Sequence, residues 1–333
     1  MSVDTLGTTL AEVIAQTDRS LAAGRSPAPQ VWPTGFDPLD TYLSGGLRGG
    51  ELTLLGGPQG LGKTTWALQV TRNLAAAGAS VLFFSFEHDE LTLLERLICI
   101  ESGERDGVDG LKLRQVRHAL EASGHKATLE KRLASTPGGA DAVDTVTGWA
   151  ERVVLHRSSS ATTTVDVIRQ AAEAATRAGQ TPVVIVDYLQ KVAVTDQSQS
   201  EEDKVTKVVE SLKDLALEYG VPVLAVVVAD RESLATGKRL RVYHLRGSSA
   251  LAYEADVILM LNDKYDVVAR HHLVYNTTNA ERLRDWVVVT VEKNRTGLDR
   301  IDLEFRKCFD QGRFDAHGQP VQEQLLDERV FVD

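Results

Sequence analysis

Cysteine and proline are scarce in this sequence, and long hydrophobic runs are absent. The 333 residues contain two cysteines, Cys99 and Cys308, and nine prolines. Two cysteines are too few for a disulfide scaffold or a cysteine metal cage, and free thiols suit a reducing compartment. No apolar run approaches the roughly 18 residues that span a bilayer, and the N-terminus lacks the apolar core of a signal peptide. These absences predict a cytoplasmic protein with no membrane partner.

An excess of positive charge is also missing. Lys and Arg number 37 against 47 Asp and Glu, which gives a net charge of −10 at pH 7. No general basic surface is therefore available to capture nucleic acid from solution. Any such contact must come from a local basic cluster, or from a lining that several subunits assemble. The share of apolar residues, 43%, and of charged residues, 25%, is typical of a folded globular protein.

Strand-length apolar runs and helix-length stretches alternate from Val31 onward. The apolar runs cover residues 52–55, 81–86, 183–186, 223–228, 257–261 and 287–291. The helical patterns cover residues 64–77, 89–101, 165–178 and 203–219. Nearly continuous apolar strands are typical of a sheet with helices on both faces, so this order predicts an α/β domain with a mostly parallel central sheet. We place the domain at residues 31–315, with a polar insertion at about 103–150 and a C-terminal tail at 316–333.

Residues 1–30 precede this domain as an amphipathic helical arm and a short linker. The apolar residues that recur at roughly helical spacing are Leu6, Leu10, Val13, Ile14 and Leu21, and the sequence GRSPAPQ follows them. An isolated amphipathic helix is marginally stable and must pack its apolar side against a partner. Two interpretations stay open: the helix folds back on its own domain, or it docks on a neighbouring subunit.

A glycine-rich segment with a lysine and a threonine lies between the first predicted strand and the next helix. Its spacing fits G-x-x-x-x-G-K-[ST], the phosphate-binding loop. Glycines let consecutive backbone N–H groups turn toward a phosphate, and the following helix directs its N-terminus at the same anion. The lysine supplies a point charge for the β- and γ-phosphates, and the threonine hydroxyl can ligate Mg²⁺. We expect nucleotide contacts from Gly57, Pro58, Gln59, Gly60, Leu61, Gly62, Lys63, Thr64 and Thr65.

Two acidic residues follow apolar runs of the predicted sheet. Asp187 ends the run 183–186, where a carboxylate beside the phosphate loop would hold the water shell of Mg²⁺. Glu87 follows the run 81–86, a position that suits a general base polarising the attacking water. Both residues also have a structural interpretation, because strand ends often carry capping or solvated carboxylates.

The ordered series of motifs resembles the RecA-like ATPases, and most closely the motor domain of DnaB-type replicative helicases. The resemblance covers about residues 32–306. It rests on the phosphate loop with its entry TGFDPLDTYLSGGLRGGELTLLGG, on VIVDYLQ at 184–190, on HLRGSSALAYEADVILML at 244–261 and on VEKNRTG at 291–297. The resemblance implies a RecA-like P-loop fold with ATP and Mg²⁺ as cofactors. It also implies Glu87 as the catalytic glutamate, Arg96 against the adenine base, and Thr64 with Asp187 at the metal.

The same resemblance implies roles for residues far from the phosphate loop. Lys293 and Arg295 match the family's Lys-x-Arg-x-Gly run, which reaches the γ-phosphate bound by a neighbouring subunit and completes catalysis there with Lys63. The segment before the predicted strand 257–261 resembles the loop that carries DNA contacts. We therefore expect single-stranded DNA to meet Lys238, Arg239, Arg241, Arg246, Gly247 and Ser249.

Three departures from the family pattern concern the coupling of ATP to DNA. The strand before Asp230 and Arg231 ends in Val228 and Ala229, where the family has a Ser-Gln pair whose Gln senses the γ-phosphate. The family's LRESG loop reads LRGSS at 245–249, and the primase-interacting N-terminal domain has no counterpart beside the arm. These departures weaken the case for replicative loading and leave nucleotide chemistry intact.

The resemblance predicts an ATP-hydrolysing DNA helicase or translocase that acts on single-stranded DNA. It implies a ring-shaped homo-oligomer, expected to be a hexamer, with ATP hydrolysed between subunits. One alternative is a related RecA-family ATPase of the RadA or KaiC type. The other is a nucleotide-switched scaffold in a mobile-element or defence system without unwinding, which the missing Ser-Gln pair slightly favours. A loader or a mobile-element partner stays unassigned.

Overall fold

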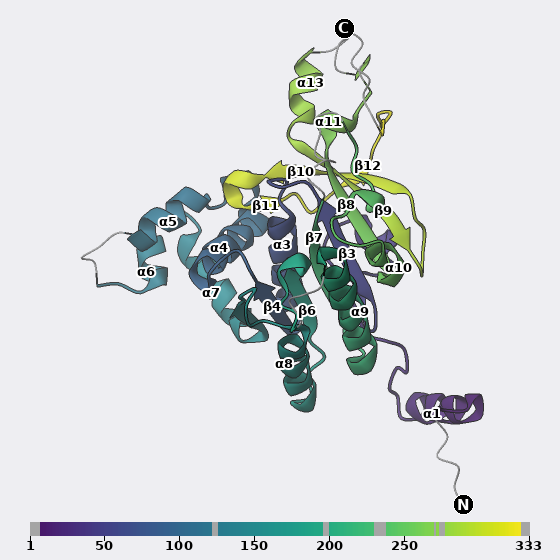
Figure 1. Ribbon diagram of the computed structural model, residues 1–333. Coiled ribbons are helices and arrows are strands. Elements are labelled where there is room, and N and C mark those ends of the chain that lie inside the picture. The colour runs from purple at the N-terminus through teal and green to yellow at the C-terminus, as the bar shows by residue number, and fades with distance from the viewer. Residues whose placement is uncertain are drawn as a thin grey trace, which may run out of the picture. The chain divides into compact units, whose positions relative to one another are not determined.

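The chain divides into two compact units, residues 1–30 and 31–333, in the computed structural model (Figure 1). The structure describes residues 7–121, 126–195, 200–229, 238–269, 271–272 and 277–327. Within these residues, no helix is both long and apolar enough to cross a bilayer.

The first unit contains one helix, α1 (Leu10–Ala22), among its described residues. Thr9 begins it with a capping box: the Thr9 N–H donates to Glu12 Oε2 at 2.8 Å, and the Glu12 N–H donates to Thr9 Oγ1 at 3.3 Å. A capping box satisfies two N–H groups that a helix start leaves without partners. Leu10, Ile14 and Leu21 are exposed along the helix. A helix therefore forms where the spacing predicts one, although Leu6 lies outside the described residues.

The second unit is built on a twisted sheet that has ten strands within the described residues. The strand order is β11-β10-β9-β8-β3-β7-β6-β4-β5, and β12 pairs with β10. The parallel strands are β3 (Leu52–Gly57), β4 (Val81–Ser85), β5 (Val153–Arg157), β6 (Val183–Asp187), β7 (Val223–Val228) and β8 (Val257–Asp263). The antiparallel strands are β9 (Trp286–Asn294), β10 (Ile301–Cys308), β11 (Arg313–Phe314) and β12 (Gln319–Pro320). A separate pair consists of β1 (Val31–Trp32) and β2 (Leu47–Arg48). The predicted α/β class with a mostly parallel sheet is confirmed.

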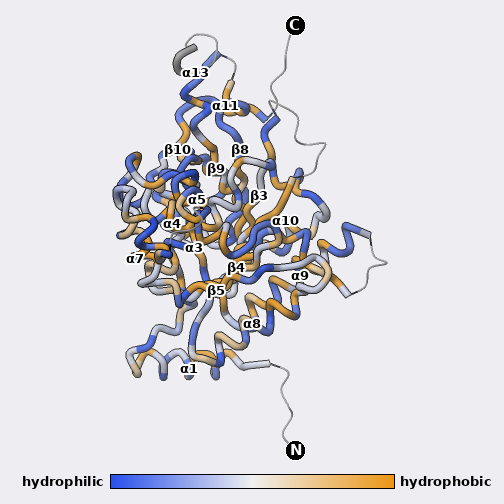
Figure 2. The backbone as a smooth tube through the Cα atoms, turned by 90° about the vertical axis from the view of Figure 1, so that its left-hand side faces the viewer, coloured by the Kyte–Doolittle hydropathy of each residue, from blue (hydrophilic) through white to orange (hydrophobic). Residues whose placement is uncertain are grey.

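Helices cover both faces of the parallel part of the sheet. One face packs against α3 (Lys63–Ala76) and α4 (Glu90–Asp106), and the other against α8 (Val165–Arg177), α9 (Glu201–Tyr219) and α10 (Ala250–Glu254). Successive residues of a strand point to opposite faces of the sheet. Phe83 and Ile185 pack toward α3 and α4, whereas Phe84 and Val186 pack toward α8 and α9. Burial on both faces explains why a strand such as β4 is hydrophobic along its length (Figure 2). The remaining helices of the sheet domain outside the insertion are α2 (Leu39–Tyr42), α11 (Lys264–Val267) and α13 (Thr277–Leu283), as far as the described residues show.

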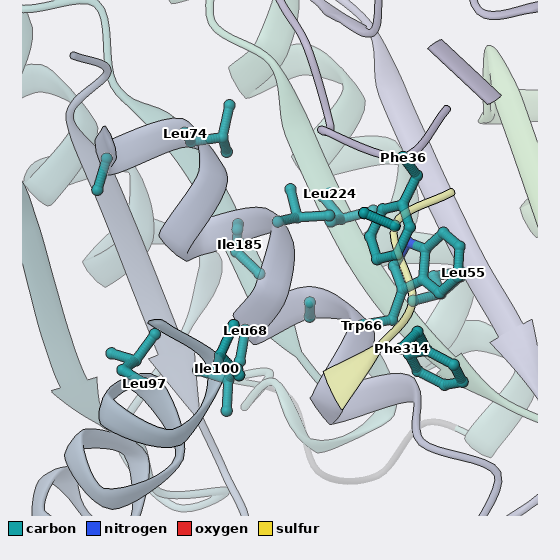
Figure 3. Packing of buried hydrophobic residues seen from close by; sticks show 14 of the residues in the cluster. Phe36, Leu55, Trp66, Leu68, Leu74, Leu97, Ile100, Ile185, Leu224 and Phe314 are labelled. Atoms are coloured by element: carbon teal, nitrogen blue, oxygen red, sulfur yellow. The ribbon is translucent and has the colours of Figure 1, made fainter. Parts of the chain in front are cut away.

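An aromatic cluster fixes the first turns of α3 against the sheet. The rings of Phe36 and Trp66 stack with centroids 3.6 Å apart, and Phe314 contacts the Trp66 ring at 5.3 Å (Figure 3). Phe305 meets the Trp66 ring edge-on at 5.1 Å. Such aromatic pairs stabilise a core beyond the area that they bury. Because Trp66 lies on the first turn of α3, this packing sets the position of Lys63 at the start of that helix.

The predicted polar insertion is helical in the part of it that the structure describes. The first helix, α4, extends to Asp106, and α5 (Leu113–Glu121), α6 (Leu129–Leu133) and α7 (Gly139–Trp149) follow it. Of these, α5 and α7 pack against α4, and α6 packs against α5 and α7 (Figure 1). The Trp149 indole donates to Glu101 Oε2 at 3.3 Å, which fastens α7 to α4. The strand after the insertion, β5, was not predicted. It lies at the edge of the sheet, so its residues are partly exposed and lack a continuous apolar run.

Candidate functional site

The predicted phosphate loop connects the end of β3 to the start of α3. Gly60 and Gly62 adopt φ values of 80° and 89°, in the left-handed region that other residues rarely enter. A Cβ atom on Gly62 would lie 2.8 Å from the Phe314 ring and 2.9 Å from the Phe309 ring, whereas one on Gly60 would meet nothing within 4 Å. The loop therefore packs against aromatic rings at Gly62 and has open space at Gly60, which leaves room for a phosphate.

Lys63 lies within this loop and is largely removed from solvent. Its Nζ donates to the carbonyl oxygens of Gly57 and Pro58, both at 2.8 Å. Burial lowers the pKa of the ammonium to about 8, and the charges of Asp187 and Glu87 oppose that shift. A buried ammonium beside an open glycine loop is suited to an anionic ligand that restores its full charge.

Asp187 lies beside the phosphate loop, at the end of β6. Thr64 Oγ1 donates to Asp187 Oδ2 at 2.7 Å. Asp187 is 1% exposed, and its burial, with a contribution from the Glu87 charge, raises the pKa of the carboxyl to about 6. A nearby cation would stabilise the ionised form of this buried carboxyl. The hydroxyl and carboxylate oxygens are ligands of the kind that Mg²⁺ prefers, and Mg²⁺ commonly takes one or two protein ligands and keeps several waters. The described residues contain no group of three or more His, Cys, Asp or Glu side chains that could hold a metal ion.

A pocket of about 860 Å³ brings most of the predicted nucleotide residues together. Its predicted lining residues are Gln59, Gly60, Gly62, Lys63, Thr64, Thr65, Glu87, Arg96 and Asp187. Gly57, Pro58 and Leu61 belong to the loop without lining this pocket, and Leu61 is buried in the core. The volume falls within the range typical of small-molecule sites. The geometry therefore gathers the predicted loop and both carboxylates at one edge of the sheet.

Arg96 projects into this pocket from α4. Its Nε is buried without a hydrogen-bond partner among the described residues. Burial, and then the charge of Arg117, lowers the pKa of the guanidinium. A half-buried guanidinium that lines the pocket with an unpartnered N–H can donate to a ligand there.

Several further residues line the pocket although the motifs did not reveal them. Phe309 follows β10, and its ring contacts Phe314 edge-on at 5.3 Å. Leu113 comes from α5, and Tyr188 directly follows Asp187. Phe309 is 38% exposed, which leaves an aromatic surface at the pocket for a planar group. Of these residues, only Tyr188 could have been suggested by the sequence, because it directly follows Asp187 at the end of an apolar run.

Lys293 and Arg295 lie at the opposite edge of the sheet from the phosphate loop of the same chain. The register pairs Lys293 with Ile258, and Ile258 with Leu54 near the beginning of β3, whereas the loop follows the end of β3. Lys293 Nζ donates to the Ala252 carbonyl at 2.8 Å, and burial lowers its pKa. Arg295 pairs with Asp256 at 3.4 Å. The structure therefore does not bring these two cations to the pocket of their own chain.

The predicted DNA loop is connected to β7 by a glutamine from the segment after β6. Gln190 Nε2 donates to the carbonyls of Val228 at 3.3 Å and Arg246 at 3.1 Å, and Gln190 Oε1 accepts from the Val228 N–H at 3.3 Å. The end of β7 itself carries Val228 and Ala229 where we expect the family's Ser-Gln pair. Gln190 belongs to the VIVDYLQ run and does not line the pocket, so it joins the backbones of the two segments without replacing the Ser-Gln pair. Asp230 and Arg231 lie outside the described residues.

The candidate DNA residues differ in how far solvent reaches them. Arg246 and Ser249 are exposed, and Lys238 and Gly247 are half-buried. Arg246 lines the edge of the nucleotide pocket and pairs with Glu201 at 2.7 Å. A Cβ atom on Gly247 would lie 2.5 Å from the Val205 side chain, so the loop packs closely on α9.

Two of the predicted DNA contacts need correction. Arg239 is 4% exposed, donates to Thr290 Oγ1 at 2.9 Å and forms an ion pair with Asp302. Arg241 lies between Glu292, at 2.8 Å, and Asp327, at 2.7 Å. Buried or doubly compensated cations have little charge left for a phosphate. We therefore remove Arg239 and Arg241 from the candidate DNA contacts.

The raised pKa of Asp187 predicts a specific pH dependence of stability. Because the folded-state pKa of about 6 exceeds the ordinary 3.8, the folded protein binds more protons between these values, and this carboxyl costs stability as the pH rises. Asp187→Asn removes that cost. From about pH 4 to about pH 7, the free energy of unfolding of the variant should gain about 2 kcal/mol relative to wild type. Urea unfolding of both proteins measures this difference, and parallel pH profiles would contradict the prediction.

Comparison with known proteins identifies the family. A family model described as the DnaB-like helicase C terminal domain matches residues 32–314. The replicative DNA helicase DnaB of Treponema pallidum is 26% identical over 278 residues, which cover 83% of this chain and 54% of that protein. The replicative DNA helicase DnaC of Bacillus subtilis is 24% identical over 299 residues, which cover 86% of this chain and 58% of that protein. The chain thus spans a little more than half the length of these relatives.

The solved structures agree on the fold. One of them, described as an ATPase domain, superposes with a TM-score of 0.71 at 20% sequence identity, covering 92% of this chain and 98% of that chain. A DnaB-like replicative helicase studied with primase superposes with a TM-score of 0.70, also at 20% identity, covering 92% of this chain and 68% of that chain. With a RecA-like fold around the phosphate loop and a family model that matches most of its length, this chain belongs to the DnaB-like helicase C-terminal domain family.

Proposed function

We propose that this chain is an ATP-dependent translocase that moves along single-stranded DNA as a ring, and that ATP is hydrolysed between its subunits. One observation carries the proposal. The nucleotide pocket holds Lys63, Asp187 and Glu87, whereas Lys293 and Arg295 lie at the opposite edge of the same sheet. A second copy that presents this opposite edge to the pocket would complete the site. The family membership supports the same arrangement.

The pocket residues divide the chemistry among them. Lys63 and the loop glycines would hold the phosphates of ATP, Arg96 and Phe309 would bind the base, and Thr64 with Asp187 would hold Mg²⁺. When bound, Mg²⁺ neutralises charge on the phosphate oxygens. Glu87 is exposed at the pocket, where its carboxylate can orient the attacking water. Lys293 and Arg295 of the neighbouring copy would stabilise the charge that develops in the transition state.

Mixing two inactive variants tests whether the site is shared. Lys63→Ala removes the phosphate contact, and Arg295→Ala removes the cation supplied to the neighbour, each lowering ATP hydrolysis by about 10³-fold. In mixed oligomers some interfaces combine an intact pocket with an intact Arg295, so activity should partly return. ATP turnover of the mixture, measured with native mass spectrometry to establish mixing, gives the answer.

A mixture of Lys63→Ala with Glu87→Ala serves as the control for this experiment. Lys63 and Glu87 line the same pocket of one chain, so every pocket in the mixture carries one of the two losses. No interface is then complete, and activity should not return even when the oligomers are demonstrably mixed. Mixed oligomers of Lys63→Ala and Arg295→Ala that stay as inactive as this control would show a self-contained site and overturn the proposal.

The loop at 245–249 is the proposed contact with single-stranded DNA. Arg246 is exposed beside the nucleotide pocket, and Gln190 holds the backbone of its loop against β7. In a ring, one copy of this loop per subunit would reach a common channel and supply the positive charge that a chain of net charge −10 lacks. Nucleotide in the pocket could thus influence the loop through the adjoining strand end.

Arg246→Ala should weaken binding of single-stranded DNA more than Lys238→Ala does. Arg246 lies in the contact loop and is exposed, whereas Lys238 is half-buried and lies outside that loop. With a non-hydrolysable ATP analogue, Arg246→Ala should lower affinity by about tenfold and reduce the salt dependence, because a phosphate contact is lost in each subunit. Fluorescence anisotropy of labelled oligothymidine measures both quantities. An equal loss from the two variants would refute the assignment of Arg246.

The N-terminal arm is proposed to support assembly of the ring. The exposed apolar residues Leu10, Ile14 and Leu21 form part of a helix that can bury several side chains, each worth about 2 kcal/mol when fully covered. Deleting residues 1–25 should therefore shift the protein toward monomer at low micromolar concentration while leaving its fold intact. Mass photometry reads the distribution. Unchanged oligomers would indicate that the arm does not contribute to assembly.

A further inference from the structure

The insertion carries a local excess of positive charge on an otherwise acidic protein. Residues 112–132 contain six Lys and Arg and two Glu, although the whole chain has a net charge of −10. Five of the basic side chains in this segment are exposed, and we name them the insertion patch: Arg114, Arg117, His118, Lys126 and Lys131. None of these residues belongs to the nucleotide pocket or to the loop at 245–249.

The patch is displayed on a packed scaffold. Val116 of α5 and Leu133 of α6 are fully buried. Arg132 Nη1, on α6, donates to the α5 carbonyls of Ala119 at 3.1 Å and Leu120 at 3.4 Å, and so joins the two helices. A pocket of about 420 Å³ lies between them, with His118 and Lys131 in its wall. His118 and Lys131 therefore border a concave surface between α5 and α6, and Arg114 and Arg117 lie on α5 beside it.

Most of the charge in the patch is uncompensated. Arg117 pairs with Glu95 at 3.1 Å. Within the described residues, Arg114, Lys126 and Lys131 form no ion pair. Exposed cations that gather without acidic partners repel one another, and a bound polyanion relieves this repulsion. Binding to a nucleic acid is further favoured because the phosphates release their condensed counterions.

The composition of the patch discriminates between forms of nucleic acid. Residues 107–138 contain no Phe, Tyr or Trp. Single-stranded DNA is usually held by stacking its bases on aromatic side chains, and a surface without them has no stacking platform. Lys and Arg on helices are instead suited to the regularly spaced phosphates of a duplex, which fix a protein on DNA without reading its sequence.

We propose that α5 and α6 form a second DNA-binding surface, which binds the phosphate backbone of double-stranded DNA without sequence preference. This surface is separate from the proposed contact with single-stranded DNA and needs neither nucleotide nor ring assembly. The duplex contacts Arg114, Lys126 and Lys131, and Arg117 adds charge beside them. A molecule that pulls on a single strand could in this way also hold the adjoining duplex.

The test uses the full chain without nucleotide or Mg²⁺, and a labelled duplex of about 30 base pairs of mixed sequence, which suffices for several phosphate contacts. The patch variant is Arg114→Gln/Lys126→Gln/Lys131→Gln. Fluorescence anisotropy over a series of salt concentrations should show affinity about tenfold or more below wild type. The slope of log affinity against log salt should fall by about three, close to one per removed cation.

A matched control carries the same change of charge elsewhere. Arg177→Gln/Arg282→Gln/Arg300→Gln alters three exposed arginines outside the insertion and should bind the duplex about as tightly as wild type. Arg114→Lys/Arg117→Lys keeps the charge and should also retain wild-type affinity. Surface substitutions of this kind change stability by about 0.5 kcal/mol or less, so thermal melting should be the same for all proteins.

Three results would overturn the proposal. The first is wild-type protein that does not bind the duplex, and the second is a patch variant that binds no more weakly than the control variant. The third is patch-dependent binding that favours a single strand of equal length, or a polyglutamate peptide, over the duplex. Because no nucleotide is present and Lys63, Arg246 and Arg295 are unchanged, failure here leaves the proposed translocase function untouched.

Discussion

The hydrogen bond from Thr64 to Asp187 joins two segments that lie 123 residues apart in the chain. It can form because β3 and β6 run parallel with β7 between them, so that their carboxyl ends meet at one edge of the sheet. Glu87 reaches the same edge because β4 pairs with β6. The candidate nucleotide site therefore depends on the parallel register of four strands. The site also depends on the stacking of Phe36 on Trp66, which fixes the helix that carries Lys63 and Thr64.

The part of this arrangement that is local in sequence could be predicted. The phosphate loop is one continuous segment, and Asp187 and Glu87 are marked by the buried strands that they follow. Strands covered on both faces were predicted for the same reason, whereas β5, at the sheet edge, was not. Residues that depend on distant partners could not be foreseen. Arg239 belongs to a basic segment in the sequence, yet Asp302 on β10 and Thr290 on β9 make it structural.

The hydrogen bonds between the end of β7 and the loop at 245–249 illustrate the same limit. The sequence has Val228 and Ala229 where related proteins are expected to carry a polar pair, and this local pattern does not show which segment bonds to the end of β7. Gln190 lies on a different strand connection and bonds to both Val228 and Arg246. Hydrogen bonds that cross from one strand end to the next depend on tertiary structure, so the sequence alone does not reveal that Gln190 joins β7 to the loop at 245–249.

The separation of Lys293 and Arg295 from the phosphate loop has a geometric consequence for assembly. Two copies that complete one site must join unlike surfaces, the loop edge of one sheet and the opposite edge of the next. A heterologous contact of this kind leaves one unsatisfied surface at each end of every linear assembly, and growth stops only when the rotation between neighbours closes the circle. If closure fails, the same contact builds a helical filament. If copies share the site as proposed, the rotation angle at one interface decides between a ring of fixed size and an open polymer.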